Sequence, residues 1–381
     1  MKAGVNTLFL IPGEVGGSEM YLGDTLAHAF GRRPEIEWVL FTNRENHDRL
    51  VGLFGSHSNV AFQVVNVRAR NRVARILREQ LELPWRARRA GVDVLWSAGY
   101  TAPLRAFCPQ VASVLDMQYR EFPEDLAPAA LWVSRFLIPR VVRRCSLVIA
   151  PSGFSRDQIL KYVKGSEAGR IRVVYQAASA AFGSPLASEE RTWRTLRWVP
   201  AGPYVLCVAN TYPHKNVPTL VEAFAGLVSR IPHRLVLVGG AGRGEEAVRT
   251  ALRRVESADR CLRLSGLPRE DLVALYQGAD AFVLPSLYEG FGLPVLEAMA
   301  AGVPTLVTRR GPMPEIGLDA VRYFDGTAGG LAAELESLLA LPGAERAELV
   351  AAARRRAGDF TWERSADGVV ACLREAVTPS G

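Results

Sequence analysis

Residues 284–304, Leu-Pro-Ser-Leu-Tyr-Glu-Gly-Phe-Gly-Leu-Pro-Val-Leu-Glu-Ala-Met-Ala-Ala-Gly-Val-Pro, show best how this chain is built. They begin at the end of an apolar run, residues 281–284, which predicts a buried parallel strand. Pro285 and Ser286 break that run into a loop. A helix is expected next, with Pro294 in its first turn, where a missing N–H costs nothing. The stretch therefore predicts a strand, a loop and a helix of an α/β fold.

The start of this helix is a good seat for an anion. Gly290 and Gly292 let the backbone approach a ligand closely, and the N–H groups of residues 290–293, at the positive end of the helix dipole, favour a phosphate without a metal ion. Glu289 precedes the helix and Glu297 lies about one turn inside it, eight positions later. At that spacing the two carboxylates fit opposite ends of one small ligand, each accepting hydrogen bonds from hydroxyl groups. The alternative is a solvated Glu297 and glycines that only shape a turn.

The sequence of residues 288–304 closely resembles the donor-binding signature of family 4 retaining glycosyltransferases, which have the two-domain GT-B fold. The resemblance implies that Glu289 contacts the transferred sugar and that Glu297 holds the ribose of the nucleotide. It also implies that backbone amides meet sugar and phosphate at Gly290, Phe291, Gly292 and Leu293.

Length and composition predict a soluble globular protein of two domains. The chain has 381 residues, of which 49% are hydrophobic and 22% charged. Its five cysteines form no Cys-x-x-Cys pair, which favours a reducing cytoplasm over a zinc site or a disulfide framework. The first residues run into a glycine-rich loop and not into a cleavage site, and no apolar run approaches the roughly 18 residues of a membrane span.

Short apolar runs alternate with helical patterns, which predicts parallel sheets covered by helices. The expected strands of the first half are residues 7–11, 38–42, 60–65, 92–96, 111–115, 147–150 and 171–174, and those of the second half are 204–209, 235–238, 262–264, 281–284 and 305–307. We expect a Rossmann-like domain over residues 1–183, a linker over 184–203 where periodicity is lost, and a second Rossmann-like domain over 204–360. The resemblance implies two doubly wound domains facing across a cleft, with a helix over residues 361–381 that crosses back to the first.

A glycine-rich turn, residues 12–19, follows the first expected strand, with Ser18 as a candidate helix cap. Such turns bind phosphate, but this one lacks the full dinucleotide spacing and is equally compatible with a structural role. It is similar to the N-terminal loop of the same transferases. The similarity implies that Gly16 and Gly17 reach the donor phosphates and the acceptor.

Residues 67–90 are dense in arginine and carry apolar residues at helical spacing, which predicts an amphipathic basic helix. Such a helix can lie on an anionic membrane or bind an acidic acceptor. The alternative is a solvated face whose arginines reflect genomic composition. Nucleic acid is disfavoured because aromatic residues do not alternate with the basic ones in the way that a stacking platform requires.

Two further loops follow expected parallel strands, where ligands bind in open α/β sheets. Asp116 follows the strand at residues 111–115, although a capping role is as compatible with this position. Relatives commonly have His-Asp where this chain has Leu115-Asp116. His214 and Lys215 stand in the loop of residues 210–216, and the three donors of a lysine suit a diphosphate leaving group. Family members usually have Arg-Lys-Asn there, so Lys215 matches the family and His214 departs from it. A solvated loop lysine is the alternative for Lys215.

The remaining loops of the second half resemble the nucleotide side of the family's site. The resemblance implies that Gly239 belongs to the nucleotide loop, that Leu267 lies near the base, and that residues 311–315 complete the donor pocket.

Together with these patterns, the resemblance implies a retaining hexosyltransferase that uses a nucleotide-diphospho-sugar, with GDP-mannose or a UDP-hexose as donor and a glycan or lipid-linked acceptor. Asp116, Lys215 and Glu289 are its candidate catalytic residues. The sequence has no Asp-x-Asp or His-Glu-x-x-His, so we expect no metal cofactor: Lys215, helix-end amides and His214 would neutralise the leaving diphosphate. The resemblance implies same-face substitution in polysaccharide biosynthesis. A sugar-nucleotide epimerase of the same fold and a non-catalytic carbohydrate-binding protein remain alternatives.

Overall fold

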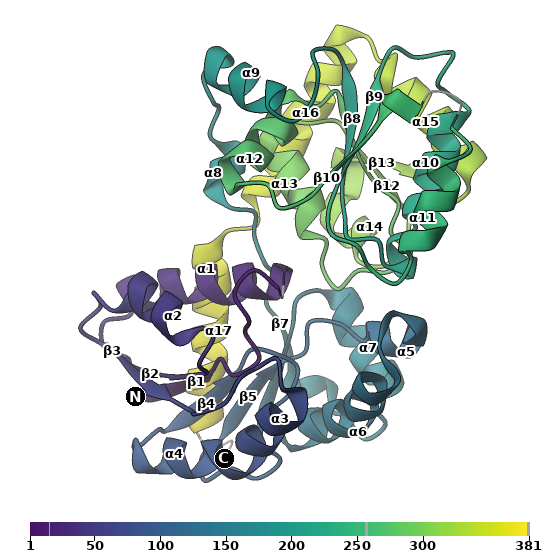
Figure 1. Cartoon of the computed structure of the whole chain (residues 1–381). Coiled ribbons are helices and arrows are strands. Elements are labelled where there is room, and N and C mark those ends of the chain that lie inside the picture. The colour runs from purple at the N-terminus through teal and green to yellow at the C-terminus, as the bar shows by residue number, and fades with distance from the viewer. Residues whose placement is uncertain (15, 256–257, 379–381) are drawn as a thin grey trace. The chain divides into compact units, whose positions relative to one another are not determined.

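The computed structural model describes residues 1–14, 16–255 and 258–378, and the chain divides into two compact units. Unit 1 comprises residues 1–117, 128–176 and 361–381, and unit 2 comprises residues 118–127 and 177–360. Each unit is a parallel sheet with helices on its faces (Figure 1). This is the doubly wound architecture that the sequence predicts.

Unit 1 is built on a seven-stranded sheet of order β3-β2-β1-β4-β5-β6-β7. The strands are β1 (Lys2–Asn6), β2 (Glu37–Thr42), β3 (Val60–Val64), β4 (Val94–Ser97), β5 (Gln110–Ser113), β6 (Leu147–Ala150) and β7 (Ile171–Val173). The helices are α1 (Gly17–Arg32), α2 (His47–Phe54), α3 (Arg72–Leu81), α4 (Leu83–Arg89), α6 (Pro128–Arg144), α7 (Gly153–Tyr162) and α17 (Trp362–Val377), with a 3-10 turn at Ala168–Arg170. The central strands are buried on both faces, as helix-covered parallel strands must be.

Unit 2 is built on a six-stranded sheet of order β10-β9-β8-β11-β12-β13. The strands are β8 (Tyr204–Val208), β9 (Arg234–Val238), β10 (Cys261–Leu264), β11 (Ala281–Leu284), β12 (Thr305–Thr308) and β13 (Arg322–Phe324). The helices are α5 (Gln118–Glu121), α8 (Ala180–Gly183), α9 (Ser188–Leu196), α10 (Val217–Ala225), α11 (Glu245–Leu252), α12 (Arg269–Gly278), α13 (Leu293–Ala301), α14 (Met313–Gly317), α15 (Ala328–Leu339) and α16 (Gly343–Gly358). Short 3-10 turns lie at Pro123–Asp125, Pro213–Lys215, Ala258–Arg260 and Leu318–Ala320.

Each sheet has one point at which the order of its strands reverses. In unit 1 this point lies between β1 and β4, and in unit 2 it lies between β8 and β11. The loops that leave two such strands diverge to opposite faces of the sheet and open a crevice between them. Each unit therefore has one pair of candidate binding loops. They follow β1 and β4 in unit 1, and β8 and β11 in unit 2.

The C-terminal helix α17 belongs to unit 1, where it packs against α1 and crosses it, although the two lie near opposite ends of the chain (Figure 1). Trp362, Val369 and Leu373 are buried on its inner side. The Thr361 hydroxyl accepts from the backbone N–H of Arg364 at 3.2 Å and so caps the first turn. Unit 1 thus needs the last segment of the chain to complete its core.

The first strand lies five residues earlier than the sequence predicts. β1 spans Lys2–Asn6, and the apolar residues 7–11 form a buried loop. The amide of Asn43 donates to the carbonyl oxygens of Leu8 and Leu10 at 3.1 and 2.8 Å, and that of Asn46 donates to the carbonyl of Thr7 at 2.8 Å. These side chains take the place of a neighbouring strand, so the run is apolar because it is buried and not because it is extended.

Residues 184–203 are not a structureless linker. They contain α9, which is anchored to α12 in unit 2: the carboxylate of Asp271 accepts from Arg194 at 3.1 Å and from the indole of Trp198 at 2.8 Å. None of the residues of α9 is buried, and its sequence is mostly polar, so no apolar run marks it. The short strand β13 was not predicted, and the predicted basic helix of residues 67–90 is two helices, α3 and α4.

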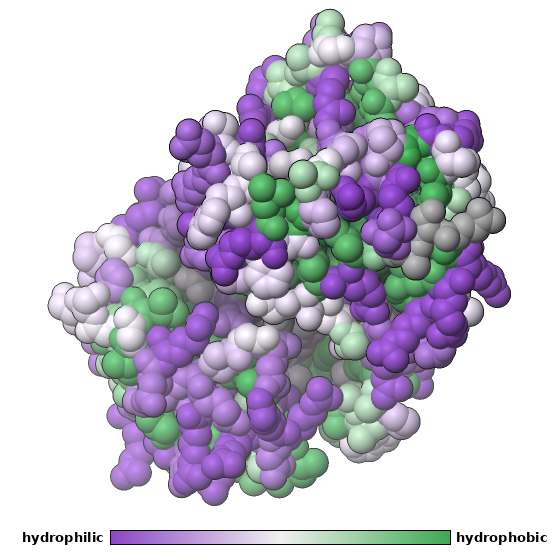
Figure 2. All heavy atoms as spheres, turned by 45° about the horizontal axis from the view of Figure 1, so that its top comes forward, coloured by the Kyte–Doolittle hydropathy of each residue, from purple (hydrophilic) through white to green (hydrophobic). Residues whose placement is uncertain are grey.

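The surface is mixed in character. The face shown in Figure 2 is largely hydrophilic, with hydrophobic residues scattered over it in small groups. Within the described ranges, no helix combines the length and the apolar character needed to span a bilayer.

Candidate functional site

The two loops at the reversal point of unit 2 are joined to each other. One follows β8 and carries the 3-10 turn Pro213–Lys215, after which Asn216 takes a left-handed φ of 53° and α10 begins. The other follows β11 and leads into α13. The backbone N–H of Leu287 in the second loop donates to the carbonyl of His214 in the first at 2.8 Å. The sheet and this hydrogen bond together hold the two loops in one place.

Lys215 and Glu289, one from each loop, form an ion pair. The Nζ of Lys215 donates to Oε1 of Glu289 at 2.6 Å, and only 19% and 11% of the two side chains are exposed. Burial alone would raise the pKa of the Glu289 carboxyl, but the charges of Lys215 and His214 outweigh it and lower that pKa below its ordinary value. Glu289 is therefore ionised at neutral pH and can accept hydrogen bonds from sugar hydroxyls. The alternative of a solvated loop lysine is wrong.

The start of α13 presents backbone N–H groups next to this pair. Gly292 precedes the helix with a φ of 104°, and a Cβ at this position would overlap the methyl group of Met313 at the start of α14. Pro294 lies in the first turn, as predicted, and no side-chain hydrogen bond caps this helix. Amides of a first turn without a side-chain cap suit a phosphate oxygen. Residues 311–315, expected to complete the pocket, reach this helix through Met313.

Glu297 is buried inside α13 and not solvated, so that alternative is wrong. Its Oε2 accepts a hydrogen bond from the hydroxyl of Tyr276 on α12 at 2.9 Å. Burial raises the pKa of Glu297 to about 7, although the tyrosine hydrogen bond and Arg269 act in the opposite direction. Near neutral pH this carboxyl is poised between its two protonation states. Tyr276 carried no sequence signal, because it lies in another helix within an ordinary apolar pattern.

His214 points into a buried polar contact with residues 118–127, which also belong to unit 2. Its Nδ1 lies 2.7 Å from Oδ2 of Asp125 and 3.0 Å from Nε2 of Gln118. Its ring stacks on Tyr212 with centroids 6.0 Å apart. His214 thus has partners that its place beside Lys215 did not predict. A role in donor binding stays a prediction for this residue.

The loop after β9 is shaped by backbone contact and by one carboxylate. Gly239 has a φ of 153°, and a Cβ there would overlap the carbonyl oxygen of Ala209. Glu245 at the start of α11 pairs with Arg263 and accepts from the hydroxyl of Thr211 at 2.8 Å. The Arg263 hydrogen bonds dominate and, against burial, lower the pKa of Glu245 to about 2. The loop is therefore fixed by a permanently charged network.

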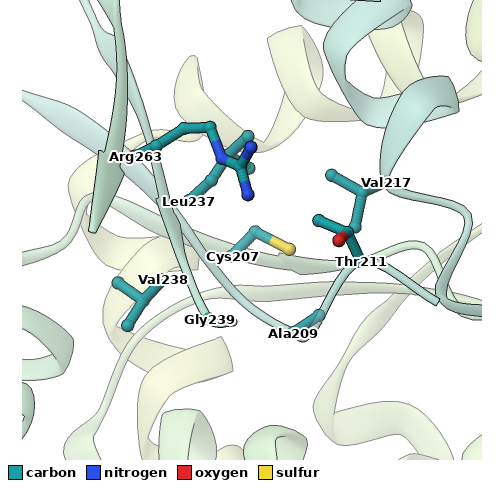
Figure 3. A pocket seen from close by; sticks show the side chains of 8 residues that line it. All are labelled: Cys207, Ala209, Thr211, Val217, Leu237, Val238, Gly239 and Arg263. Atoms are coloured by element: carbon teal, nitrogen blue, oxygen red, sulfur yellow. The ribbon is translucent and has the colours of Figure 1, made fainter. Parts of the chain in front are cut away.

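A small pocket lies beside this loop, lined by Cys207, Ala209, Thr211, Val217, Leu237, Val238, Gly239 and Arg263. Figure 3 shows the Cys207 thiol with the guanidinium of Arg263 above it and the hydroxyl of Thr211 to its right. Burial raises the pKa of that thiol to about 12, so it is unreactive. Leu267 lies half-buried in the loop between β10 and α12.

The remaining candidates belong to unit 1. Gly16, with a φ of 56°, is the last residue of the loop after β1, and Gly17 is the first residue of α1. Ser18 lies inside the helix and does not cap it, so that prediction is wrong. Asp116 follows β5 and accepts a hydrogen bond from the hydroxyl of Tyr100 at 2.6 Å. Tyr100 lies in the loop after β4 with a φ of 66°, so Asp116 faces a loop of the reversal point of this sheet.

Across the ranges that the structure describes, no group of three or more His, Cys, Asp or Glu side chains is arranged to hold a metal ion.

Similar solved structures define the class of the fold as GT-B. Sucrose-phosphate synthase from Thermosynechococcus elongatus superposes with a TM-score of 0.78 at 20% identity, covering 98% of each chain. Anabaena HepE, solved with UDP-glucose, superposes with a TM-score of 0.75 at 20% identity over 98% of this chain and 100% of the other.

Sequence comparison links the second half of the chain to a known family. Residues 191–356 match the model described as "Glycosyl transferases group 1". O-antigen chain mannosyltransferase B of Escherichia coli is 32% identical over 184 residues, 46% of each chain. The D-inositol 3-phosphate glycosyltransferase of Acidothermus cellulolyticus is 32% identical over 233 residues, 56% of this chain and 50% of that protein. The chain spans about half the length of the curated relatives that it matches.

Proposed function

We propose that this protein is a retaining glycosyltransferase that moves a hexosyl unit from a nucleotide-diphospho-sugar to a glycan or lipid-linked acceptor. The observation that carries the proposal is the Lys215–Glu289 ion pair, at 2.6 Å, beside the start of α13 at the reversal point of the sheet. The names of the relatives support it, because they include mannosyltransferases and D-inositol 3-phosphate glycosyltransferases. GDP-mannose or a UDP-hexose is the proposed donor, and HepE was solved with UDP-glucose.

The proposed roles follow from the chemistry of each group. Lys215 and the N–H groups of residues 290–293 neutralise the departing diphosphate, so that no metal ion is required. Glu289, ionised, accepts from the hydroxyls of the transferred sugar. Glu297 accepts from the ribose hydroxyls once it has lost its proton. His214, Gly239 and Leu267 are proposed to act on the donor side of unit 2.

Retention follows from substitution on one face of the sugar. The bond between the anomeric carbon and the phosphate oxygen breaks, and the acceptor oxygen bonds to the same face of that carbon. The acceptor proton passes to the departing phosphate, whose charge Lys215 balances. Asp116, Gly16 and Gly17 of unit 1 are proposed to take part in this reaction. Polysaccharide biosynthesis in the cytoplasm, at the inner face of the membrane, is the proposed setting.

The test begins with the nucleotide. We expect UDP or GDP to raise the melting temperature of the protein in EDTA, and the matching nucleotide sugar to be consumed only when an acceptor is added. Lys215→Ala should lose most of the thermal shift, because the charge opposite the diphosphate is gone. Glu289→Gln should keep the shift and lose transfer by at least about a hundredfold, in line with the loss of one electrostatic contact to the reacting group.

Three results would contradict the proposal. A thermal shift that survives in Lys215→Ala would place the diphosphate elsewhere. An epimer formed from the donor alone would indicate a sugar-nucleotide epimerase. Binding of glycans with no response to any nucleotide would indicate a carbohydrate-binding protein.

A further inference from the structure

The helix α3 in unit 1 is attached to its unit through polar side chains. Of its ten residues Glu79 alone is buried. Its Oε2 accepts from Nδ2 of Asn6 at 3.2 Å and from Oγ1 of Thr101 at 3.0 Å. The next residue, Gln80, donates to the carbonyl of Ala102 at 3.0 Å. The inner side of this helix therefore carries buried, hydrogen-bonded polar groups beside Ala74, which packs against the core of the unit.

The apolar side of α3 faces outward. Val73, Leu77 and Leu81 follow one another at four-residue steps, so they form one stripe along the helix. Their exposed fractions are 71%, 53% and 68%. A surface helix of a globular protein normally turns such a stripe toward the core. Here the stripe of Val73, Leu77 and Leu81 stays exposed.

An aromatic cluster extends this stripe. Trp85 on α4 and Phe107 lie with ring centroids 4.7 Å apart, and both are more than half exposed. The guanidinium of Arg88 lies 4.7 Å from the Phe107 ring centroid and 5.7 Å from that of Trp85. Tryptophan beside arginine is the composition of a bilayer interface, where the ring enters the headgroup layer and the cation meets phosphate.

Positive charge surrounds these apolar groups. Residues 68–89 contain eight arginines against two glutamates, and one of the two, Glu79, is turned inward. The other, Glu82, pairs with Arg78 and Arg86. Arg144 at the end of α6 donates to the carbonyl of Leu104 at 2.9 Å, which brings the end of that helix beside the same loop. The surface therefore combines exposed apolar tips with an excess of arginine.

We propose that this surface, the basic apolar platform of Val73, Leu77, Leu81, Trp85, Phe107 and the arginines of residues 68–89, docks the protein on a bilayer containing anionic lipid. An anionic bilayer fits both features of the platform. Its charged headgroups can pair with the arginines, and the apolar interior beneath them can take up the exposed apolar side chains. A protein partner would need an apolar groove lined by carboxylates. The complementarity of charge and of apolar groups therefore favours the lipid surface.

The position of the platform gives it a part in the reaction. Glu79 connects α3 to Asn6, the last residue of β1, and to Thr101 in the loop after β4. These are the two strands between which the sheet order of unit 1 reverses. Docking would thus hold the binding loops of unit 1 beside the lipid surface. This step rests on the proposed function, in which the acceptor is lipid-linked; the docking itself does not.

Co-sedimentation of the full chain with vesicles tests the docking. The vesicles are phosphatidylcholine alone or with about one-third phosphatidylglycerol. We expect binding to the anionic vesicles only, weakened by high salt. Leu77→Ser/Leu81→Ser should lower the partition coefficient at least about tenfold, because two apolar side chains no longer enter the membrane. Arg72→Gln/Arg88→Gln should weaken binding and reduce its dependence on salt.

The matched control is Trp193→Ser on α9 of unit 2. This tryptophan is 58% exposed and also lies beside arginines, with the Arg197 guanidinium 5.2 Å from its ring centroid. The control should sediment like the wild type. The nucleotide-induced thermal shift, measured on every variant, should stay unchanged, which separates failure of docking from failure of the proposed function.

Equal binding to both kinds of vesicle, no binding to either, or wild-type binding by the leucine variant would overturn the proposal. So would self-association in sedimentation velocity that the leucine variant abolishes, because the platform would then be a contact between copies of this chain.

Discussion

Glu297 should make the stability of unit 2 depend on pH. Burial raises the pKa of its carboxyl to about 7 in the folded protein, from an ordinary value of 4.5. Between these two values the folded state binds more protons than the unfolded chain, so the free energy of unfolding falls as the pH rises through this window. The contribution is complete below the ordinary pKa and is lost as the pH passes about 7. Its size is at most about 3 kcal/mol.

Glu297→Gln tests this effect, because the amide keeps the shape of the side chain and cannot ionise. The free energy of unfolding is measured in urea at about pH 5 and about pH 8. Between these two pH values it should fall by roughly 2–3 kcal/mol more in the wild type than in the variant. Asp259, which is exposed, can serve as a control through Asp259→Asn, which should keep the wild-type dependence. If the free energy of unfolding falls equally in the wild type and in Glu297→Gln between the two pH values, burial does not raise the pKa of the Glu297 carboxyl.

The sequence points to single residues where a strand leads directly into a loop. Lys215 and Glu289 stand in loops 74 positions apart, and the sheet brings these loops together because β8 and β11 are neighbours. Their partners were not predictable. Tyr276 and Asp125 lie in segments with no ligand-binding pattern, and only the packing of α12 and of residues 118–127 places them at the site.

At the scale of the element, Gly292 determines how α13 begins. Its φ of 104° is a left-handed conformation that costs an L-residue about 1–2 kcal/mol, and the Met313 methyl group occupies the space of a Cβ. Gly292→Ala should therefore rotate the first N–H groups of the helix and weaken UDP or GDP binding at least about tenfold. Nucleotide titration by calorimetry measures the change.

Gly329→Ala is the matched control for this substitution. Gly329 lies in α15 with no positive φ and open space where a Cβ would stand. Alanine there should stabilise the protein by about 0.5–1 kcal/mol or leave it unchanged, with normal nucleotide affinity. Normal affinity in Gly292→Ala would mean that the start of α13 does not hold the diphosphate.

Elements were predicted where burial and periodicity agree. The strands of both sheets were found from their apolar runs, apart from the displaced β1 and the short β13. The apolar residues 7–11 imitate a strand because Asn43 and Asn46 satisfy their carbonyl groups in a loop. The helix α9 is the opposite case, because it is mostly polar and buries no residue, so no apolar run marks it. Side-chain hydrogen bonds between distant segments decide both cases, and periodicity does not report them.

At the scale of the molecule, the C-terminal helix α17 stabilises unit 1, which also contains the N-terminal strands. Leu373 of α17 is fully buried in unit 1, where this helix packs on α1 and on β4, β5 and β6. Leu373→Ala removes buried apolar groups and should cost about 2–5 kcal/mol. Because the cost falls on unit 1, hydrogen exchange should quicken in β4, β5 and α1 and stay at the wild-type rate in β8, β11 and α13.

Val377→Ala separates this effect from a general weakening of the helix. Val377 lies on the same helix one turn further on, but 38% of it is exposed, so its truncation removes little buried surface. Exchange in unit 1 should then match the wild type. Equally fast exchange in β8 and β11 of Leu373→Ala would show that the two units unfold together, because a defect confined to one cooperative unit leaves the other protected.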